Sequence, residues 1–162
     1  MSPIDSRVRP VEPRDVDAVV GLVHELARYE RAEAECTLTG SQLAAALFGP
    51  QPALFGHVGV VAGQVVGCAL WFLNFSTWCG VHGVYLEDLY VQPAHRGTGL
   101  GRALLAELAD ECQRRGYARL EWAVLDWNDA AIGFYRSIGA MAQDDWTVFR
   151  LSGQALSQLA RR

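Results

Sequence analysis

The stretch that decides the fold is Val91-Gln92-Pro93-Ala94-His95-Arg96-Gly97-Thr98-Gly99-Leu100-Gly101-Arg102. It follows a run rich in β-branched and aromatic residues, 81–91, and it opens a run with helical periodicity that extends from Gly99 to about Arg115. Glycines let a ligand approach the backbone closely, and the free N–H groups at a helix start favour an anion. The stretch therefore predicts a strand-to-helix turn that holds a phosphate, most naturally a pyrophosphate.

Two common phosphate-binding motifs do not fit this turn. A P-loop requires a Gly-Lys pair after four variable residues, and the chain contains no Gly-Lys pair. The dinucleotide fingerprint requires a third glycine five residues after the first. That position is Arg102 when counted from Gly97, and it is Leu104 when counted from Gly99. The turn therefore matches neither the P-loop nor the dinucleotide-binding motif.

The runs on either side of the turn alternate between strand-like and helix-like periodicity. We expect strands at residues 7–9, 53–61, 65–75, 81–91, 118–125 and 146–151. We expect helices from Pro13 to about Arg31, after the capping box Thr39–Gln42, from Gly99 to about Arg115, and from Asp129 to Ser137. This order predicts an α/β (α+β) fold, with a mixed sheet covered by helices and one domain over residues 1–162.

Composition limits the classes of function. The chain has 162 residues, 51% of them hydrophobic, which fits one compact domain. Its formal net charge of −4 argues against a nucleic-acid or membrane partner. The longest apolar runs, such as 68–73, are too short to cross a bilayer, and the N-terminus has no secretory signal. The four cysteines form no C-x-x-C pair and the histidines are scattered. We therefore expect a cytoplasmic protein with reduced thiols and no metal site.

Beyond the turn, several stretches resemble one enzyme family along the whole chain. They are Glu25-Leu26-Ala27-Arg28-Tyr29-Glu30, Tyr85-Leu86-Glu87-Asp88-Leu89-Tyr90-Val91, Arg96–Gly101, and Trp127-Asn128 with Gly133-Phe134-Tyr135. The Arg96-x-x-Gly99-x-Gly101 pattern resembles the pyrophosphate-binding motif of the GNAT acetyltransferases, and the whole set is similar to their diamine branch, which includes spermidine/spermine and thialysine acetyltransferases. The resemblance implies a mostly antiparallel sheet of six to seven strands, with helices on both faces and a splayed central strand pair.

The same resemblance implies acetyl-CoA as cosubstrate, and no metal. The cofactor-binding residues that it implies are Leu89, Tyr90, Val91, Arg96, Gly97, Thr98, Gly99, Leu100, Gly101, Arg102, Asn128 and Ala131. Backbone groups of 89–91 would bind the pantetheine arm and the acetyl carbonyl, and 97–102 would hold the pyrophosphate. Asn128 is equally typical of an N-cap for the helix that follows, and the two roles can coexist.

Acetyl transfer needs a neutral amine and a proton for the departing thiolate. An alkyl amine with a pKa of about 10.4 costs roughly 4–5 kcal/mol to deprotonate at pH 7. Glu87 is the candidate base, and in a regular strand it would face the side of the sheet opposite to Asp88. Tyr135 matches the catalytic tyrosine of the family and is the candidate acid. Protonating a thiolate of pKa about 8.5 from a phenol of pKa about 10 is uphill by only about 2 kcal/mol.

The resemblance also implies an acceptor site and an assembly. The substrate-binding residues that it implies are Tyr29, Glu30, Glu87 and Asp144, with Asp145 as an alternative to Asp144. They would form a negative groove for a polyamine, diamine or lysine-like amine, and family members are usually homodimers. Two alternatives remain open at this point: a protein lysine or N-terminal acetyltransferase, and a non-catalytic acyl-CoA-binding module.

Overall fold

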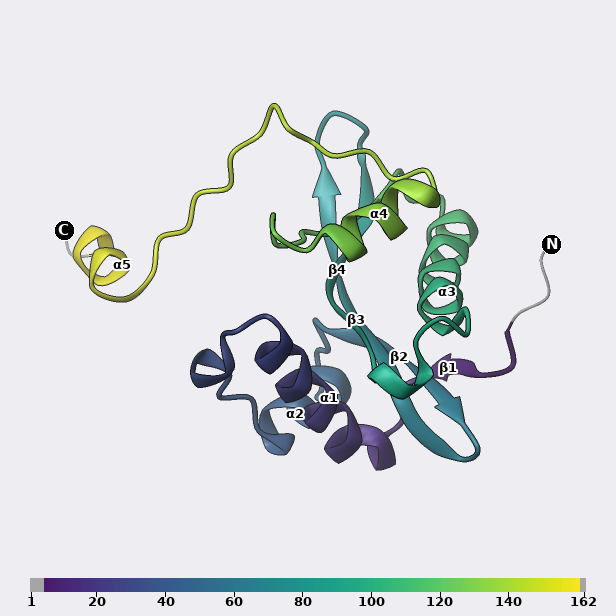
Figure 1. The fold of residues 1–162 in the computed structure, drawn as a ribbon. Helices are drawn as coiled ribbons and strands as arrows, with labels where there is room; N and C mark the ends of the chain where they lie inside the picture. Colours follow the sequence, from purple (N-terminus) through teal and green to yellow (C-terminus); the bar gives the residue numbers. More distant parts are fainter. Residues whose placement is uncertain (1–4, 161–162) are drawn as a thin grey trace. The chain divides into compact units, whose positions relative to one another are not determined.

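The computed structural model describes residues 5–160 of the chain, drawn in Figure 1. Contacts within the chain divide it into two compact units, Met1–Ala123 and Val124–Arg162. The first unit contains the sheet and most of the predicted site, whereas the second contains the remaining predicted site residues.

The first unit is built around a five-stranded sheet in the order β1-β2-β3-β4-β5. The strands are β1 (Val8–Pro10), β2 (Phe55–Val61), β3 (Gln64–Ser76), β4 (Val81–Val91) and β5 (Leu120–Glu121). Neighbouring strands are antiparallel except for β4 and β5, which are parallel. The mixed, mostly antiparallel sheet agrees with the predicted fold class, although it has five strands where we expected six or seven.

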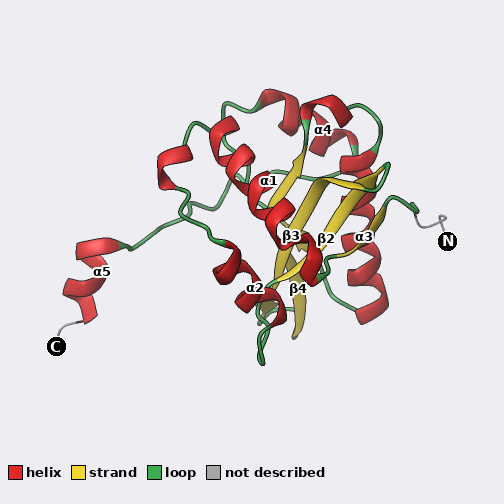
Figure 2. Cartoon of the chain, turned by 90° about the horizontal axis from the view of Figure 1, so that it is seen from below, coloured by secondary structure: helices red, strands yellow, loops and turns green. Residues whose placement is uncertain are grey.

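Helices lie on both faces of this sheet (Figures 1 and 2). They are α1 (Val16–Tyr29), α2 (Gly40–Phe48) and α3 (Leu100–Arg115), with short 3-10 turns η1 (Pro13–Asp15), η2 (Glu33–Glu35) and η3 (Pro93–His95). Alternate strand residues such as Val58, Cys68 and Leu70 form one core with buried residues of α1 and α2. On the opposite face, Leu100 of α3 lies directly over β2 and β3. The sheet therefore separates α1 and α2 from α3.

Two glycines let the start of α3 come close to the sheet. Gly59 of β2 and Gly67 of β3 are cross-strand partners. A Cβ atom added at Gly59 would lie 2.9 Å from the Cδ1 atom of Leu100, and one added at Gly67 would lie 3.5 Å from its Cδ2 atom. Leu100 itself is almost completely buried. The position of the glycine-rich turn in front of α3 is thus fixed by packing from below.

The sheet opens beside the second half of β4. The pairing of β4 with β5 covers only Val84 with Leu120 and Tyr85 with Glu121, although we predicted a longer strand at 118–125. Directly afterwards the β3–β4 register shifts, so that Trp71 pairs with Leu86 and Leu70 with Asp88, which leaves Glu87 as a bulge residue. From there to Val91 the edge of β4 has no β5 partner. This agrees with the predicted splayed strand pair.

The second unit contains two helices, α4 (Asp129–Ser137) and α5 (Gly153–Ala160). The strand predicted at 146–151 is not formed: these residues have no strand pairing in the structure of 5–160. A strand is stable only through hydrogen bonds to a neighbour, and this unit has no second strand within its described residues. The correct alternating pattern was therefore insufficient to predict a strand there.

Candidate active site

The glycine-rich turn forms a row of unsatisfied backbone donors. Gly97 has φ 74° and Gly99 has φ 82°, the left-handed conformation that glycine adopts without strain. Within residues 5–160, none of the N–H groups from Gly97 to Arg102 has a hydrogen-bond acceptor. The first N–H of the helix that is paired is that of Ala103, which donates to the Gly99 carbonyl at 2.9 Å. A normal helix start leaves its first turn of donors unpaired, and here the preceding turn adds more. The arrangement fits a bound pyrophosphate.

Side chains of the turn hold its shape from within. The Thr98 hydroxyl donates to the His95 carbonyl at 2.7 Å, and the Arg96 Nε atom donates to the Val91 carbonyl at 2.9 Å. The Arg96 guanidinium also lies 5.2 Å from the ring centre of Tyr29 and 5.3 Å from that of Tyr90, both within cation–π range. The predicted cofactor residue Arg96 is therefore bound within the protein, where it connects the turn to α1 and β4.

Asp88 lies close to the predicted site residues Glu87 and Glu30, although the sequence reasoning did not include it. It pairs with Leu70, so it lies on the α1 side of the sheet, and its side chain is half-buried. Burial, and then the charges of Glu87 and Glu30, raise its pKa to about 6. Such a carboxylate is mostly ionised at neutral pH, yet it is a stronger base than a surface aspartate. The available signal was a second acid beside Glu87 in a strand that has no other charged residue apart from His82.

The structure brings three predicted acceptor-site residues to this region. Glu30 directly follows α1, its partial desolvation raises its pKa, and its charge acts on Asp88. Tyr29 is the last residue of α1 and is 40% exposed. Glu87 is exposed in the bulge. Because Glu87 has no partner on β3, the regular alternation of β4 is interrupted there: Leu86 and Asp88 pair with consecutive residues of β3 and so face opposite sides of the sheet.

The other predicted site residues belong to the second unit. The Asn128 side chain accepts a hydrogen bond from the Ala131 N–H at 3.3 Å, so it is the N-cap that we considered as an alternative. Tyr135 lies in α4, is partly buried, and has its ring centre 5.5 Å from that of Phe134. Asp144 is exposed in the segment after α4. Their roles stay predictions.

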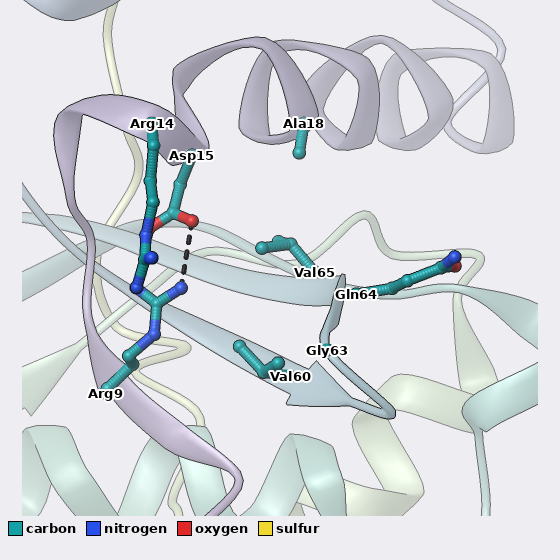
Figure 3. A pocket seen from close by; sticks show the side chains of 8 residues that line it. All are labelled: Arg9, Arg14, Asp15, Ala18, Val60, Gly63, Gln64 and Val65. Atoms are coloured by element: carbon teal, nitrogen blue, oxygen red, sulfur yellow. Dashed lines mark hydrogen bonds and ion pairs between the residues drawn. The ribbon is translucent and has the colours of Figure 1, made fainter.

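The hollow in Figure 3 is not this site. It lies between the start of α1 and the β2–β3 hairpin, and no predicted site residue lines it. Its charged groups are paired, since Arg9 binds Asp15 at 2.6 Å and Arg14 binds Glu12 at 2.7 Å. Over residues 5–160 the structure shows no cluster of three or more side chains that could hold a metal ion, and no helix long and apolar enough to cross a membrane.

The sequence matches a family model and named relatives over most of its length. Residues 22–140 match the model of the acetyltransferase (GNAT) family. The chain is 32% identical to a thialysine N-epsilon-acetyltransferase of Mus musculus, over 97% of this chain and 98% of the relative, and 28% identical to the L-ornithine N5-acetyltransferase NATA1 of Arabidopsis thaliana, over 95% and 87%.

Solved structures show the same fold. An integron cassette protein from the mobile metagenome of V. cholerae superimposes with a TM-score of 0.80 at 27% identity, over 96% of this chain and 97% of that one. An aminoglycoside acetyltransferase from a soil metagenome, at 17% identity and a TM-score of 0.77 over 93% and 99%, shares the fold. Because the family model covers most of the chain and its relatives match nearly end to end, the chain belongs to the GNAT acetyltransferase family and is an acyltransferase.

Proposed function

We propose that the protein transfers an acetyl group from acetyl-CoA to a primary amine of a small, basic molecule, such as a diamine or a lysine-like amino acid. One observation carries this proposal. The donor row at 97–102 and the acidic pair Asp88 and Glu30 lie in one unit, and Arg96 of the turn contacts Tyr29, which precedes Glu30, and Tyr90, which is two residues from Asp88 on β4. These contacts bring the proposed phosphate site close to the proposed cation site.

The two acids would bind the acceptor and prepare it for attack. Both attract the protonated amine. Asp88 has a pKa of about 6, closer to 7 than that of an ordinary carboxylate, and is therefore the better proton acceptor near pH 7. Glu87, in the adjacent bulge, remains the predicted base if a water molecule relays the proton to it. Acetyl-CoA supplies an activated thioester, so the chain needs no covalent intermediate of its own. The open edge of β4 at 89–91 offers backbone groups to orient the acetyl carbonyl.

Tyr135 is the proposed proton donor to the thiolate. A phenol is a slightly weaker acid than the thiol that it forms, by about 2 kcal/mol for ordinary pKa values of about 10 and 8.5. That difference is small enough for a local electrostatic field to offset it. The proposal requires α4 to present Tyr135 to the sulfur atom, and turnover of a Tyr135 variant tests it.

The relatives support a basic amine as the acceptor. Their names specify thialysine and L-ornithine, both amino acids with a side-chain amine, and a further relative is a spermidine/spermine N(1)-acetyltransferase-like protein of Homo sapiens. Amines of this class carry a positive charge at pH 7 that complements Glu30 and Asp88. All 14 Lys and Arg residues of the chain are arginines, so it has no lysine side chain that could be acetylated in competition.

The test is thiol release from acetyl-CoA with a panel of acceptors. Thialysine, lysine, ornithine, putrescine, spermidine, an aminoglycoside and a lysine-bearing peptide would be compared at equal concentration, with a blank for the cysteines of the protein. We expect the amino acids and diamines to exceed the peptide by at least about tenfold in kcat/KM. Preference for the peptide would favour a protein acetyltransferase. Binding of CoA without turnover of any amine would favour an acyl-CoA-binding module.

The proposal includes a homodimer. Residues 146–151 have no regular secondary structure and no strand partner within 5–160, and they carry the exposed apolar side chains Trp146, Val148 and Phe149. A second copy could cover these side chains and supply the missing hydrogen bonds. Sedimentation velocity at assay concentrations should give a dimer, and Phe149→Asp should shift it to monomer. A fully active wild-type monomer would contradict this part of the proposal.

A further inference from the structure

Arg7 reaches the glycine-rich turn from the other end of the chain. It directly precedes β1, and its carbonyl accepts a hydrogen bond from the Val60 N–H at 2.7 Å, which fixes its backbone to β2. Its side-chain Nη1 atom donates to the Thr98 carbonyl at 3.2 Å. Its Nη2 atom lies 3.9 Å from the position of a Cβ added at Gly99. The guanidinium therefore lies against the peptide between Thr98 and Gly99.

Asp5 fixes the orientation of this guanidinium. The Asp5 carboxylate accepts from Arg7 Nε at 2.9 Å, from Nη2 at 2.6 Å, and from the Arg7 backbone N–H at 3.0 Å. These bonds lower the pKa of Asp5 to about 2, chiefly through its hydrogen bond with Arg7. A carboxylate bound to two nitrogen atoms of the fork leaves Nη1 directed away from it. That remaining nitrogen is the one on the Thr98 carbonyl.

We propose that Arg7, held by Asp5, is a positioning residue that aims the backbone donors of the turn at the pyrophosphate of the acetyl donor. No cis peptide bond occurs among the described residues, and in a trans peptide the carbonyl and the next N–H point in opposite directions. Holding the Thr98 carbonyl on the β1 side therefore directs the Gly99 N–H to the other side. The inference rests on the proposed use of acetyl-CoA and assigns to this function a residue outside the predicted site.

Arg7 acts through the peptide and is not itself a phosphate ligand. Its Nε and Nη2 atoms are already bound to Asp5, and the charge of the guanidinium is compensated there. A glycine pair with left-handed φ on both sides of Thr98 makes the turn easy to deform, because glycine readily exchanges between conformations. One charge-assisted hydrogen bond on the central carbonyl limits that freedom before the ligand binds.

The experiment measures CoA binding to the full chain by calorimetry, without any amine. Arg7→Met should weaken CoA binding by about tenfold, because the turn must then be ordered during binding. Arg14→Met is the matched control: it removes another arginine near the N-terminus, which is 73% exposed and paired with Glu12. It should bind CoA like the wild type. Wild-type protein that does not bind CoA overturns the proposed function and this inference together, whereas equal binding by Arg7→Met overturns the inference alone.

Two further measurements separate positioning from direct contact and from simple unfolding. Asp5→Asn should weaken CoA binding if Asp5 aims Arg7, and it should tighten binding if Arg7 is a phosphate ligand that Asp5 restrains. With S-acetylpantetheine, which lacks the pyrophosphate, Arg7→Met should retain the wild-type kcat/KM within twofold. With acetyl-CoA its KM should rise about tenfold at unchanged kcat. An equal loss with both acetyl donors would indicate a general structural defect and would contradict the proposal.

Discussion

The starts of α3 and α4 both follow a strand-like stretch of the sequence, but their backbone N–H groups are treated differently. At the start of α3, the N–H groups from Gly97 to Arg102 have no acceptor within residues 5–160. At the start of α4, Asn128 accepts a hydrogen bond from the Ala131 N–H. Both turns resemble the cofactor-binding turns of the family, yet one is satisfied by its own side chain. We therefore propose the start of α3, and not that of α4, as the anion site.

Unsatisfied donors at a helix start cost stability, and a bound anion recovers that cost. A good N-cap contributes about 1 kcal/mol, and glycine in place of a capping residue gives up a few tenths of this and costs backbone entropy. Gly99 is the N-cap of α3 and makes no side-chain cap, whereas Asn128 caps α4. The comparison therefore predicts a large effect on ligand binding at Gly99, and at Asn128 an effect on stability with little effect on ligand binding.

The largest expected effect is on Gly99. Gly99→Ala should weaken CoA binding by at least about 30-fold, because the added methyl group disfavours the left-handed conformation that orders the donor row. Gly116→Ala is the matched control: Gly116 has φ 68° at the other end of the same helix. Both variants should lose about 1–2 kcal/mol of unfolding free energy. Equal CoA affinities in the two variants would contradict the role assigned to the α3 start.

If the start of α4 is satisfied internally, α4 must contribute to function through its body. Tyr135→Phe should lower kcat by at least about tenfold while CoA binding stays within twofold of the wild type. Ser137→Ala provides a control on the same helix, since the Ser137 hydroxyl only donates to the Phe134 carbonyl at 2.6 Å. Initial-rate assays with saturating concentrations of the best amine from the acceptor panel give kcat. Full activity of the Tyr135 variant would exclude it as the acid.

Asp88 extends the comparison to a charge. Its pKa of about 6 lies above the usual aspartate value, so between about pH 4 and 6 the folded state binds more protons than the unfolded state. Stability therefore falls as pH rises through this window and stays reduced above it. Asp88→Asn should raise the unfolding free energy at pH 7 by about 1–2 kcal/mol, with screening allowed for, and the gain should vanish near pH 4.

The same variant should lose activity. Asp88→Asn removes a negative charge from the acceptor site, so kcat/KM for a cationic amine should fall about tenfold while CoA affinity is unchanged. Glu87→Gln is the stability control, because the Glu87 side chain is exposed and its removal should give no comparable gain at pH 7. Chemical denaturation at several pH values provides the measurement. A variant that is fully active and no more stable would remove Asp88 from the site.

The sequence predicts local features well where local physics decides them. The glycine turn before α3, the capping box at Thr39 and Gln42, and the Asn128 cap each depend on a few neighbouring residues, and all are present in the structure. The strand at 146–151 depends on a partner strand, which no local pattern specifies, so its prediction was wrong for this structure. The family resemblance pointed to the glycine-rich turn and to Tyr29 and Glu30 at the end of α1, because it rests on sequence motifs and not on strand pairing.

Two site features depend on register and on long-range contact. The bulge at Glu87 decides how the acids of β4 are presented. Because helices cover both faces of this sheet, apolar residues stand on both faces of β4 and the change of phase at the bulge is not visible in the sequence. The Arg7 contact with Thr98 joins residues 91 positions apart, so no motif contains both. Sequence reasoning thus predicted the glycine-rich turn but included neither Asp88 nor Arg7, whose proposed roles depend on contacts made only in the fold.

The smallest expected effect is on Asn128, and it tests the comparison from the other side. Asn128→Ala should cost about 1 kcal/mol of unfolding free energy, because the Ala131 N–H loses its acceptor, while CoA affinity changes less than threefold. Asn128→Asp, which keeps the cap, should restore the stability. A loss of CoA affinity above tenfold in both variants would mean that the Asn128 amide also binds the cofactor. The two helix starts would then share that ligand, and capping at α4 would be the state of the protein before binding.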